Sequence, residues 1–396
     1  MKKFNILFRQ VASKLTEFVR RVAVNYTKPT RDFLLEFWTG MLAGQSLVLS
    51  DVSRGTGNQA LIKKQVEKFG RWLISLFCFH TMIWSYHKII KSEINDRTIY
   101  CIDNTDIAKP YGEKFGSLCQ VLDGSKGETE KGYDVINVVA LSQNSKQPIP
   151  LYTKVFSYIE PGYISNNDET RKALDCINRS FRCGGIKVFD RGFDDSELMR
   201  YLIGAGEKFI IRCKKNRSYI FEGKKYNTED MLGVPAREMK GMFRGILLTY
   251  KNYTVEVSSG LSLNLVIVSG LGKEPMTLLT NLPADNDLAQ TAGRVYMLRW
   301  KVEENHRFEK DIFDLEKFRI RDLQAIRNLV LLAAMLTGFL AVICEHQSHK
   351  LFNELYKLSK TIPKKFGKNH FYLYSIARAL QYLYQTHATL QYFSSS

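Results

Sequence analysis

A change in the residue pattern near Arg97 limits the folds that this chain of 396 residues can adopt. Residues 1–95 read as helical. Beyond them, runs rich in Val, Ile and Tyr predict three strands, at Thr98–Asp103, Tyr133–Ser142 and Pro150–Ser157. Over residues 167–212, helical segments then alternate with short apolar runs. Three strands followed by alternating helix and strand predict a mixed α/β sheet.

The alternation stops after residue 212, where further strands predict a β-rich insertion over residues 213–275. The expected strands of the insertion are Gly245–Tyr250, Tyr253–Ser258 and Leu263–Ser269. A strand at Met276–Asn281 then returns to the central sheet, and one long helix is expected from Leu288 to about Ile312. Residues 326–396 are expected to be helical.

The charge of the chain favours a polyanionic partner. It carries 57 Lys and Arg against 40 Asp and Glu, a formal net charge of +17. The excess is concentrated in residues 1–95, with fifteen basic and six acidic residues, and in residues 208–225, with seven basic and one acidic. Nucleic acid is the first candidate partner and an anionic membrane surface the second.

Cysteine spacing and hydropathy point to a protein of the cytosol. The seven cysteines form no Cys-x-x-Cys pair, so reduced thiols are expected. The most apolar stretch, Leu329–Cys344, has 16 residues, whereas a membrane span needs about 20. We therefore expect a buried core helix there, no membrane partner, and a cytoplasmic protein.

Two basic segments are candidates for DNA contact. A short helix from Ser50, a Gly55–Gly57 turn and a basic helix predict a helix-turn-helix, and an ordinary helical hairpin with a solvated basic face fits equally well. The candidate phosphate contacts in this helix are Lys63, Lys64 and Lys68. In the insertion, basic residues interleave with aromatics in a pattern that suits a DNA strand with a stacked base. The candidates there are Lys214, Lys215, Arg217, Tyr219 and Phe221.

Two aspartates end predicted strands of the sheet. Asp103 closes the run Thr98–Asp103, and Asp190 closes Ile186–Asp190. Carboxylates at the carboxyl ends of two sheet strands meet in one crevice. Neighbouring acids compete for the same role: Asp106 after the first, and Asp194 and Asp195 after the second.

A third carboxylate lies on a helix with a periodic charged face. Tyr296, Arg299, Glu303 and Lys310 are spaced so that, at about 100° per residue, all four project from one face of a helix. Arg307 borders this face, and Glu304 should point elsewhere because it lies about 100° from Glu303. An amphipathic helix with a solvated charged face has the same spacing.

These residues together resemble a known signature. Tyr296-x-x-Arg299-Trp300-x-x-Glu303, then six residues and Lys310, resembles the Y-R-E-K signature of bacterial insertion-sequence DDE transposases. Asp103 in Ile-Asp-Asn-Thr and Asp190 in Phe-Asp-Arg-Gly resemble the first and second acidic motifs of that group. The resemblance covers about residues 97–325.

The resemblance implies a fold and a chemistry. It implies an RNase H-like catalytic core in which Asp103, Asp190 and Glu303 bind two Mg²⁺ or Mn²⁺ ions, the arrangement that phosphoryl transfer between DNA strands needs. It also implies that Tyr296, Arg299 and Lys310 contact the phosphate backbone near the cleaved end. The expected units are a DNA-end-binding domain (1–95), a catalytic core in two parts (96–212 and 276–325), the insertion (213–275) and a helical C-terminal region that takes part in dimerisation (326–396).

The predicted function is that of a cut-and-paste transposase. Its expected partners are double-stranded DNA, as transposon terminal inverted repeats and as target DNA, and a second copy of the chain in the DNA complex; association with the nucleoid follows. Two alternatives stay open: a transposase-derived DNA-binding protein that no longer cuts, and a nuclease that does not join strands. Members of the resembled group that use a DNA hairpin hold a flipped base with a tryptophan of the insertion. The four tryptophans here (38, 72, 84 and 300) lie outside the insertion, so the resemblance does not extend to the hairpin route.

Overall fold

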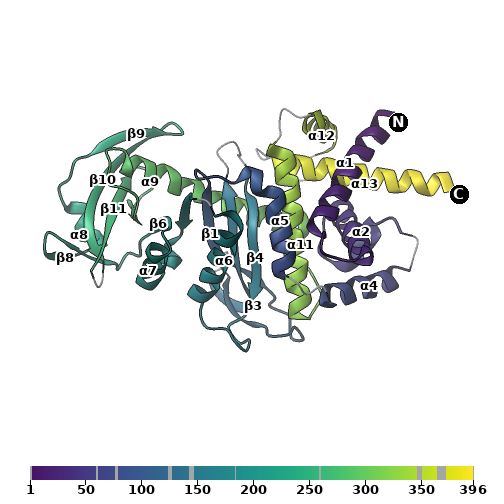
Figure 1. Cartoon of the computed structure of the whole chain (residues 1–396), viewed down its shortest axis with the longest axis horizontal. Coiled ribbons are helices and arrows are strands. Elements are labelled where there is room, and N and C mark those ends of the chain that lie inside the picture. Colours follow the sequence, from purple (N-terminus) through teal and green to yellow (C-terminus); the bar gives the residue numbers. More distant parts are fainter. Residues whose placement is uncertain are drawn as a thin grey trace.

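One mixed sheet runs through the middle of the molecule, with helices at both ends of the chain (Figure 1). The computed structural model describes residues 2–58, 61–75, 79–123, 127–141, 147–182, 184–257, 260–345, 350–363 and 372–395. In Figure 1 the β-rich insertion lies at one side of the sheet and the N- and C-terminal helices gather at the other.

The first region is helical, as predicted. Its elements are α1 (Lys2–Val22), α2 (Lys28–Gly44), α3 (Leu49–Gly55), α4 (Ile62–Ser75), α5 (Phe79–Ile90) and the 3₁₀ turn η1 (Lys91–Glu93). The expected short helix, turn and basic helix correspond to α3, a turn in which Gly57 has a φ of 68°, and α4. Residues 59 and 60 of that connection lie outside the described part.

Five strands make the part of the sheet that the sequence predicts. They are β1 (Ile99–Ala108), β3 (Glu128–Leu141), β4 (Ile149–Phe156), β5 (Ile186–Phe189) and β6 (Lys208–Arg212), in the order β4-β3-β1-β5-β6. Strand β3 is antiparallel to β4 and β1, whereas β1, β5 and β6 run parallel. The connecting helices are α6 (Asn166–Phe181), the 3₁₀ turn η2 (Arg191–Phe193) and α7 (Ser196–Gly204).

Two expectations for this part were wrong. Strand β1 continues five residues past Asp103, because its antiparallel pairing with β3 extends to Ala108 opposite Gly132. The connection between the first two predicted strands, where no strand was expected, contains β2 (Cys119–Asp123), which pairs with the outer part of β3.

The insertion extends the same sheet. Its elements are β7 (Ser218–Phe221), β8 (Lys224–Asn227), α8 (Thr228–Gly233), β9 (Met239–Phe243), β10 (Ile246–Val257) and β11 (Leu261–Ser269), and β12 (Met276–Thr280) follows it. Strand β12 pairs antiparallel with β6 and joins the two halves of the sheet. The two strands expected at Gly245–Tyr250 and Tyr253–Ser258 are one, β10, which pairs without interruption with β11.

The helix expected from Leu288 to Ile312 is divided. It consists of α9 (Leu288–Tyr296), the 3₁₀ turn η3 (Met297–Arg299) and α10 (Trp300–Phe313). The Leu298 carbonyl, inside the turn, accepts a hydrogen bond from the Cys101 thiol of β1 (3.9 Å). The rest of the chain is helical, as expected, with α11 (Leu323–Glu345), α12 (Lys350–Thr361) and α13 (Tyr372–Ser395).

Helix α11 is a core helix of this fold. Within the described residues, Leu323–Cys344 is the one stretch long and apolar enough to cross a membrane, and 83% of its most apolar window is buried inside the molecule. Polar side chains tie it to the N-terminal helices. Trp38 Nε1 donates to the Leu332 carbonyl (3.0 Å), and Asn328 Nδ2 donates to the Leu73 carbonyl (2.7 Å).

The two faces of the sheet are covered by different helices. Side chains alternate along β1, so Cys101 and Asp103 share one face while Tyr100 and Ile102 share the other. Cys101 packs with Val302 of α10, which places the Glu-bearing helix on the Asp103 face. Tyr100 and Ile102 belong to the main core, to which α6 and α11 contribute.

Candidate active site

Asp103 and Asp190 are neighbours at the carboxyl end of the parallel strands. The β1–β5 pairing ends with Ile102 opposite Phe189, so the next residue of each strand is an aspartate. The two aspartates therefore lie side by side, as expected from their strands, although Asp103 lies in the middle of β1 and not at its end.

The Phe-Asp-Arg-Gly motif fixes the orientation of Asp190. Its Oδ1 accepts a hydrogen bond from the Gly192 backbone N–H (2.8 Å) and caps the 3₁₀ turn. A Cβ at residue 192 would lie 3.0 Å from this oxygen, which favours glycine there. The competing aspartates have other partners: Asp194 is paired with Arg217, and Asp195 caps α7 by accepting from the Leu198 N–H (2.9 Å).

Arg299 links two of the three carboxylates. Its Nη1 lies 3.6 Å from Asp103 Oδ1, and its Nη2 forms an ion pair with Glu303 Oε1. Residue 299 closes the 3₁₀ turn, so the turn brings the guanidinium toward β1 while Glu303, one turn into α10, stays half-exposed.

The carboxyl of Asp103 is hard to ionise in this setting. The pKa of Asp103 is raised to about 7 by burial and by the charges of Asp190 and Glu303, which outweigh the lowering by Arg299 and by the Asn104 backbone N–H. The repulsion from Asp190 and Glu303 shows that the three carboxylates share one electrostatic environment. A positive charge at this place would favour the ionised form of Asp103.

Two more polar side chains face the same environment. Tyr296 is buried, and burial raises the pKa of its phenol; the charges of Arg299 and Arg212 lower that pKa, and the charge of Asp190 raises it. Arg212 was not among the predicted site residues. The β5–β6 pairing ends with Phe189 opposite Ile211, so Arg212 is the next residue beside Asp190. The signal was present in the sequence, where Arg212 follows an apolar run as the two aspartates do.

The other charged residues of α10 differ in their partners and in their exposure. Lys310 Nζ pairs with Glu316 Oε1 (2.7 Å) and not with Glu303. Glu304 is buried and paired with Lys301 (2.8 Å), so it points away from the half-exposed Glu303, as predicted. Arg307 is exposed, and its charge acts on Glu304.

The basic segment of the insertion is mostly occupied by internal contacts. Tyr219 is 1% exposed and its hydroxyl lies 3.3 Å from Thr228 Oγ1, so its ring is not available to stack on a base, which corrects that expectation. The expectation for Arg217 also needs correction, because its guanidinium is taken up by the buried carboxylate of Asp194. Phe221 is half-buried and packs edge-on against Tyr253.

Among the other predicted DNA contacts, exposure differs. Lys214 is exposed, and Lys215 is exposed but paired with Glu274 (2.7 Å). The side chains of Lys63 and Lys64 on α4 are exposed. Lys68 on the same helix is partly exposed and pairs with Glu36 of α2 (2.6 Å).

The donor set fits a hard divalent cation by its chemistry. Asp103, Asp190 and Glu303 offer carboxylate oxygens, the ligands that Mg²⁺ and Mn²⁺ prefer. In the part of the chain that the structure describes, no three His, Cys, Asp or Glu side chains are close enough together to hold a metal ion. Arg299 lies between Asp103 and Glu303. Its ion pair with Glu303 has to break before the three carboxylates can come close enough to share a metal ion.

Comparison with family models identifies one family for this chain. The family model described as Transposase DDE domain matches residues 94–338, which is more than half of the chain. A cryo-EM structure of a piggyBac transposase synaptic complex with hairpin DNA is similar over 98% of this chain and 81% of that one, with 8% identity and a TM-score of 0.44. No curated protein matches. The chain belongs to the transposase DDE domain family.

Proposed function

We propose that this transposase binds the ends of a DNA transposon, cleaves the phosphodiester there, and joins the freed 3′-hydroxyl to target DNA. The proposal rests on the positions of Asp103 and Asp190, which lie side by side on neighbouring parallel strands. Arg299 contacts both Asp103 and Glu303 and so links the third carboxylate to this pair. The mixed sheet of antiparallel β4, β3 and β1 followed by parallel β5 and β6 supports an RNase H-like core.

Asp103, Asp190 and Glu303 are the residues that would hold two Mg²⁺ or Mn²⁺ ions. When bound, the two ions supply charge stabilisation at the attacking and leaving oxygens of an in-line displacement. The protein contributes position: the β1–β5 register holds the aspartates, and the Gly192 N–H holds the Asp190 carboxylate in one orientation.

The basic side chains around the carboxylates would hold the DNA. Arg299 and Arg212 can each pair with a phosphate oxygen, and the Tyr296 hydroxyl can donate to one. A phosphate that takes up the Arg299 guanidinium releases Asp103 and Glu303 together. DNA binding and cation binding would then favour each other. A phosphate on Arg299 frees the carboxylates for a cation, and a cation on the carboxylates frees Arg299 for a phosphate.

Other regions of the chain would contribute to DNA binding and to assembly. Residues 1–95 would bind the transposon end through Lys63 and Lys64, and Lys214, Lys215 and Lys310 would add phosphate contacts. The helical residues 326–396 would support a homodimer in the DNA complex. The protein would work in the cytoplasm, on the nucleoid.

Cleavage by carboxylate variants tests the proposed function. The substrate is a plasmid carrying the gene with its flanking DNA. Asp103→Asn, Asp190→Asn and Glu303→Gln should each reduce Mg²⁺-dependent cleavage at least a thousandfold and leave DNA binding within about twofold, because each change removes a charge with little change of shape. Asp106→Asn is the matched control: it lies three residues along β1 on the opposite face of the sheet and should retain activity.

The same assay separates the alternatives. A DNA-binding protein that no longer cuts would show no cleavage by the parent chain. A nuclease that does not join strands would release ends without producing joined products. Full activity of all three carboxylate variants would refute the assignment of the site.

A further inference from the structure

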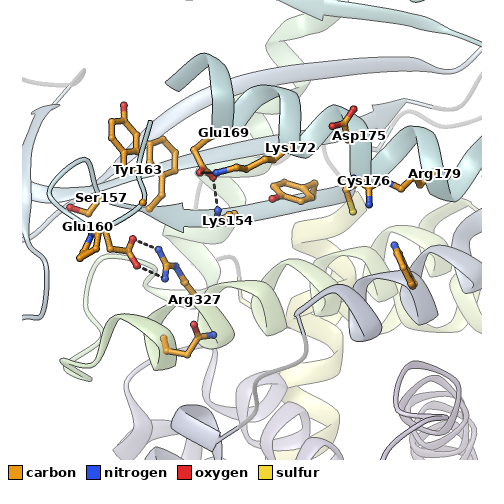
Figure 2. A pocket seen from close by; sticks show the side chains of 16 residues that line it. Lys154, Ser157, Glu160, Tyr163, Glu169, Lys172, Asp175, Cys176, Arg179 and Arg327 are labelled. Carbon is orange, nitrogen blue, oxygen red and sulfur yellow. Dashed lines mark hydrogen bonds and ion pairs between the residues drawn. The ribbon is translucent and has the colours of Figure 1, made fainter. Parts of the chain in front are cut away.

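Two cavities meet between α5 and α6, away from the carboxylates. The first, of about 530 Å³, is bounded by β4, α6 and the start of α11 (Figure 2). The second, of about 750 Å³, lies between α5 and the end of α6. Both are lined by Trp84, Asp175 and Arg179, so they form one groove, which we call the α5–α6 groove.

The α5–α6 groove lies on the sheet face opposite to the candidate active site. Strand pairing places Asp103 level with Asn137 and Thr153, and their neighbours Asn104, Ile136 and Lys154 level with one another. Side chains alternate between faces, so Lys154, which lines the first cavity, projects from the face that Asp103 does not share. A DNA segment in this groove is therefore not the segment held at the carboxylates of the same chain.

The first cavity is rigid and internally neutralised. Figure 2 shows Lys154 paired with Glu169, and Arg327 forming a two-pronged pair with Glu160. Lys172 also pairs with Glu169 (2.7 Å). These pairs shape the wall and leave little charge for a ligand.

The second cavity is lined by exposed basic side chains. Lys88 of α5, Lys91 of η1, and Arg179 and Arg182 at the end of α6 line it, and all four are exposed. Within the described residues none of the four has an ion-pair partner. The acidic residue that lines the same cavity is Asp175, whose Oδ1 accepts from the Tyr201 hydroxyl.

An aromatic ring lies where the cavities join. Trp84 is 46% exposed, although it stands on a helix whose neighbouring residues Met82, Ile83 and Tyr86 are buried. A groove that combines unpaired basic side chains with an exposed aromatic ring suits a single strand of nucleic acid, because the cations neutralise phosphates while a base stacks on the ring. A duplex keeps its bases stacked inside and could not use the ring in this way.

We propose that the α5–α6 groove binds single-stranded DNA, with Lys88, Lys91, Arg179 and Arg182 on the phosphates and a base on Trp84. The inference rests on the proposed function in one respect, that DNA is the polyanion this chain meets. The strand it binds is distinct from the one cut at the carboxylates of the same chain.

Binding without metal tests this proposal separately from cleavage. The probes are a fluorescein-labelled 20-nucleotide oligo-dT and a 20-base-pair duplex, measured by anisotropy in EDTA over a range of KCl concentrations. Lys88→Gln/Lys91→Gln and Arg179→Gln/Arg182→Gln should each weaken oligo-dT binding and reduce its salt slope by about 1.4, because a single-strand phosphate contact contributes about 0.7. Trp84→Ala should weaken it about tenfold with the slope unchanged, and Trp84→Phe should keep most of the affinity.

A control pair removes the same charge elsewhere. Lys350→Gln/Lys357→Gln changes two exposed lysines of α12 that line neither cavity, and it should leave the oligo-dT slope near that of the parent. The proposal is overturned if the groove variants bind oligo-dT as the parent does, if the control loses as much slope as they do, or if only duplex binding changes. Cleavage by the parent chain stays informative in each case, because it depends on the opposite face of the sheet.

Discussion

Arg299 is the residue on which the charge balance of the candidate site depends. It neutralises Asp103 and Glu303 in the DNA-free chain, so it stabilises the carboxylates and also competes with any cation for them. The sequence predicted Arg299 as a phosphate contact. It could not predict that Arg299 pairs with Asp103 and Glu303. That pairing depends on the 3₁₀ turn beside β1, and this turn contacts Cys101, a residue distant in sequence.

Manganese binding to the DNA-free chain tests the role of Arg299. Arg299→Gln should bind Mn²⁺ about tenfold more tightly than the parent, a gain of about 1.4 kcal/mol, because the competing guanidinium is gone. Free Mn²⁺ can be followed by electron paramagnetic resonance. Arg307→Gln removes an equal charge from an exposed residue two turns further along the chain, whereas the ion pairs to Asp103 and Glu303 come from Arg299, so it should change the affinity little. An unchanged or weaker affinity in the Arg299 variant would contradict the competition.

Arg217 shows how a basic residue can be structural in a DNA-binding protein. Its pair with Asp194 is buried, with the carboxylate side chain fully enclosed, and the Lys214 backbone N–H donates to the second Asp194 oxygen (2.7 Å). The sequence placed Arg217 in a run of cations and could not show which of them would face inward.

Stability separates Arg217 from its exposed neighbour. Arg217→Gln should lower the free energy of unfolding by about 3 kcal/mol, because it leaves a buried carboxylate without its partner. Lys214→Gln should change it by less than about 0.5 kcal/mol, since that side chain is exposed. Urea unfolding measures both. Equal stability of the two variants would show that Arg217 is not needed by the fold.

At the scale of elements, α10 serves two surfaces. Glu303 is on the side of β1, whereas Glu309 is fully buried on the side of the core, where its charge acts on Tyr86 of α5. Burial raises the pKa of Glu309 from 4.5 to about 7. The folded chain therefore keeps a proton that the unfolded chain releases as the pH rises from about 4.5 to about 7, and stability falls across that window.

Glu309→Gln should remove this pH dependence. Relative to the parent, the variant should unfold with a similar free energy near pH 4.5 and be more stable at pH 8, by a difference on the order of 3 kcal/mol. Thermal or urea unfolding at several pH values gives the comparison. Glu197→Gln, at an exposed carboxylate of α7, is the control and should show no such trend. A difference between Glu309→Gln and the parent that does not grow with pH would contradict the assignment.

Elements with strong local patterns were predicted well. The alternation predicted over residues 167–212 is present as α6, β5, α7 and β6, because apolar runs and helical segments mark these elements locally. The extension of β1 and the presence of β2 depend on pairing with β3, whose registers no local pattern records. For the same reason β10 is one strand and not two.

At the scale of the whole molecule, regions far apart in sequence share one core. Buried side chains from Leu7 of α1 to Tyr384 of α13 belong to the same hydrophobic cluster as Ile102 and Leu329. The insertion joins the central sheet through β12. The sequence predicted the mixed α/β class and the order of the regions along the chain, since the local residue pattern marks both. It did not predict that one sheet continues from β4 to β8, which depends on pairing between distant strands.

Metal specificity at Asp190 tests whether this aspartate holds a catalytic metal ion. Asp190→Cys should not cleave with Mg²⁺ and should recover cleavage with Mn²⁺, because a thiolate ligand favours the softer ion, while Asp190→Ala should cleave with neither. The parent should cleave with both ions, and all three chains should bind DNA alike. If Asp190→Ala and Asp190→Cys cleave with Mg²⁺ at the parental rate, Asp190 does not hold a catalytic metal ion and the account is wrong.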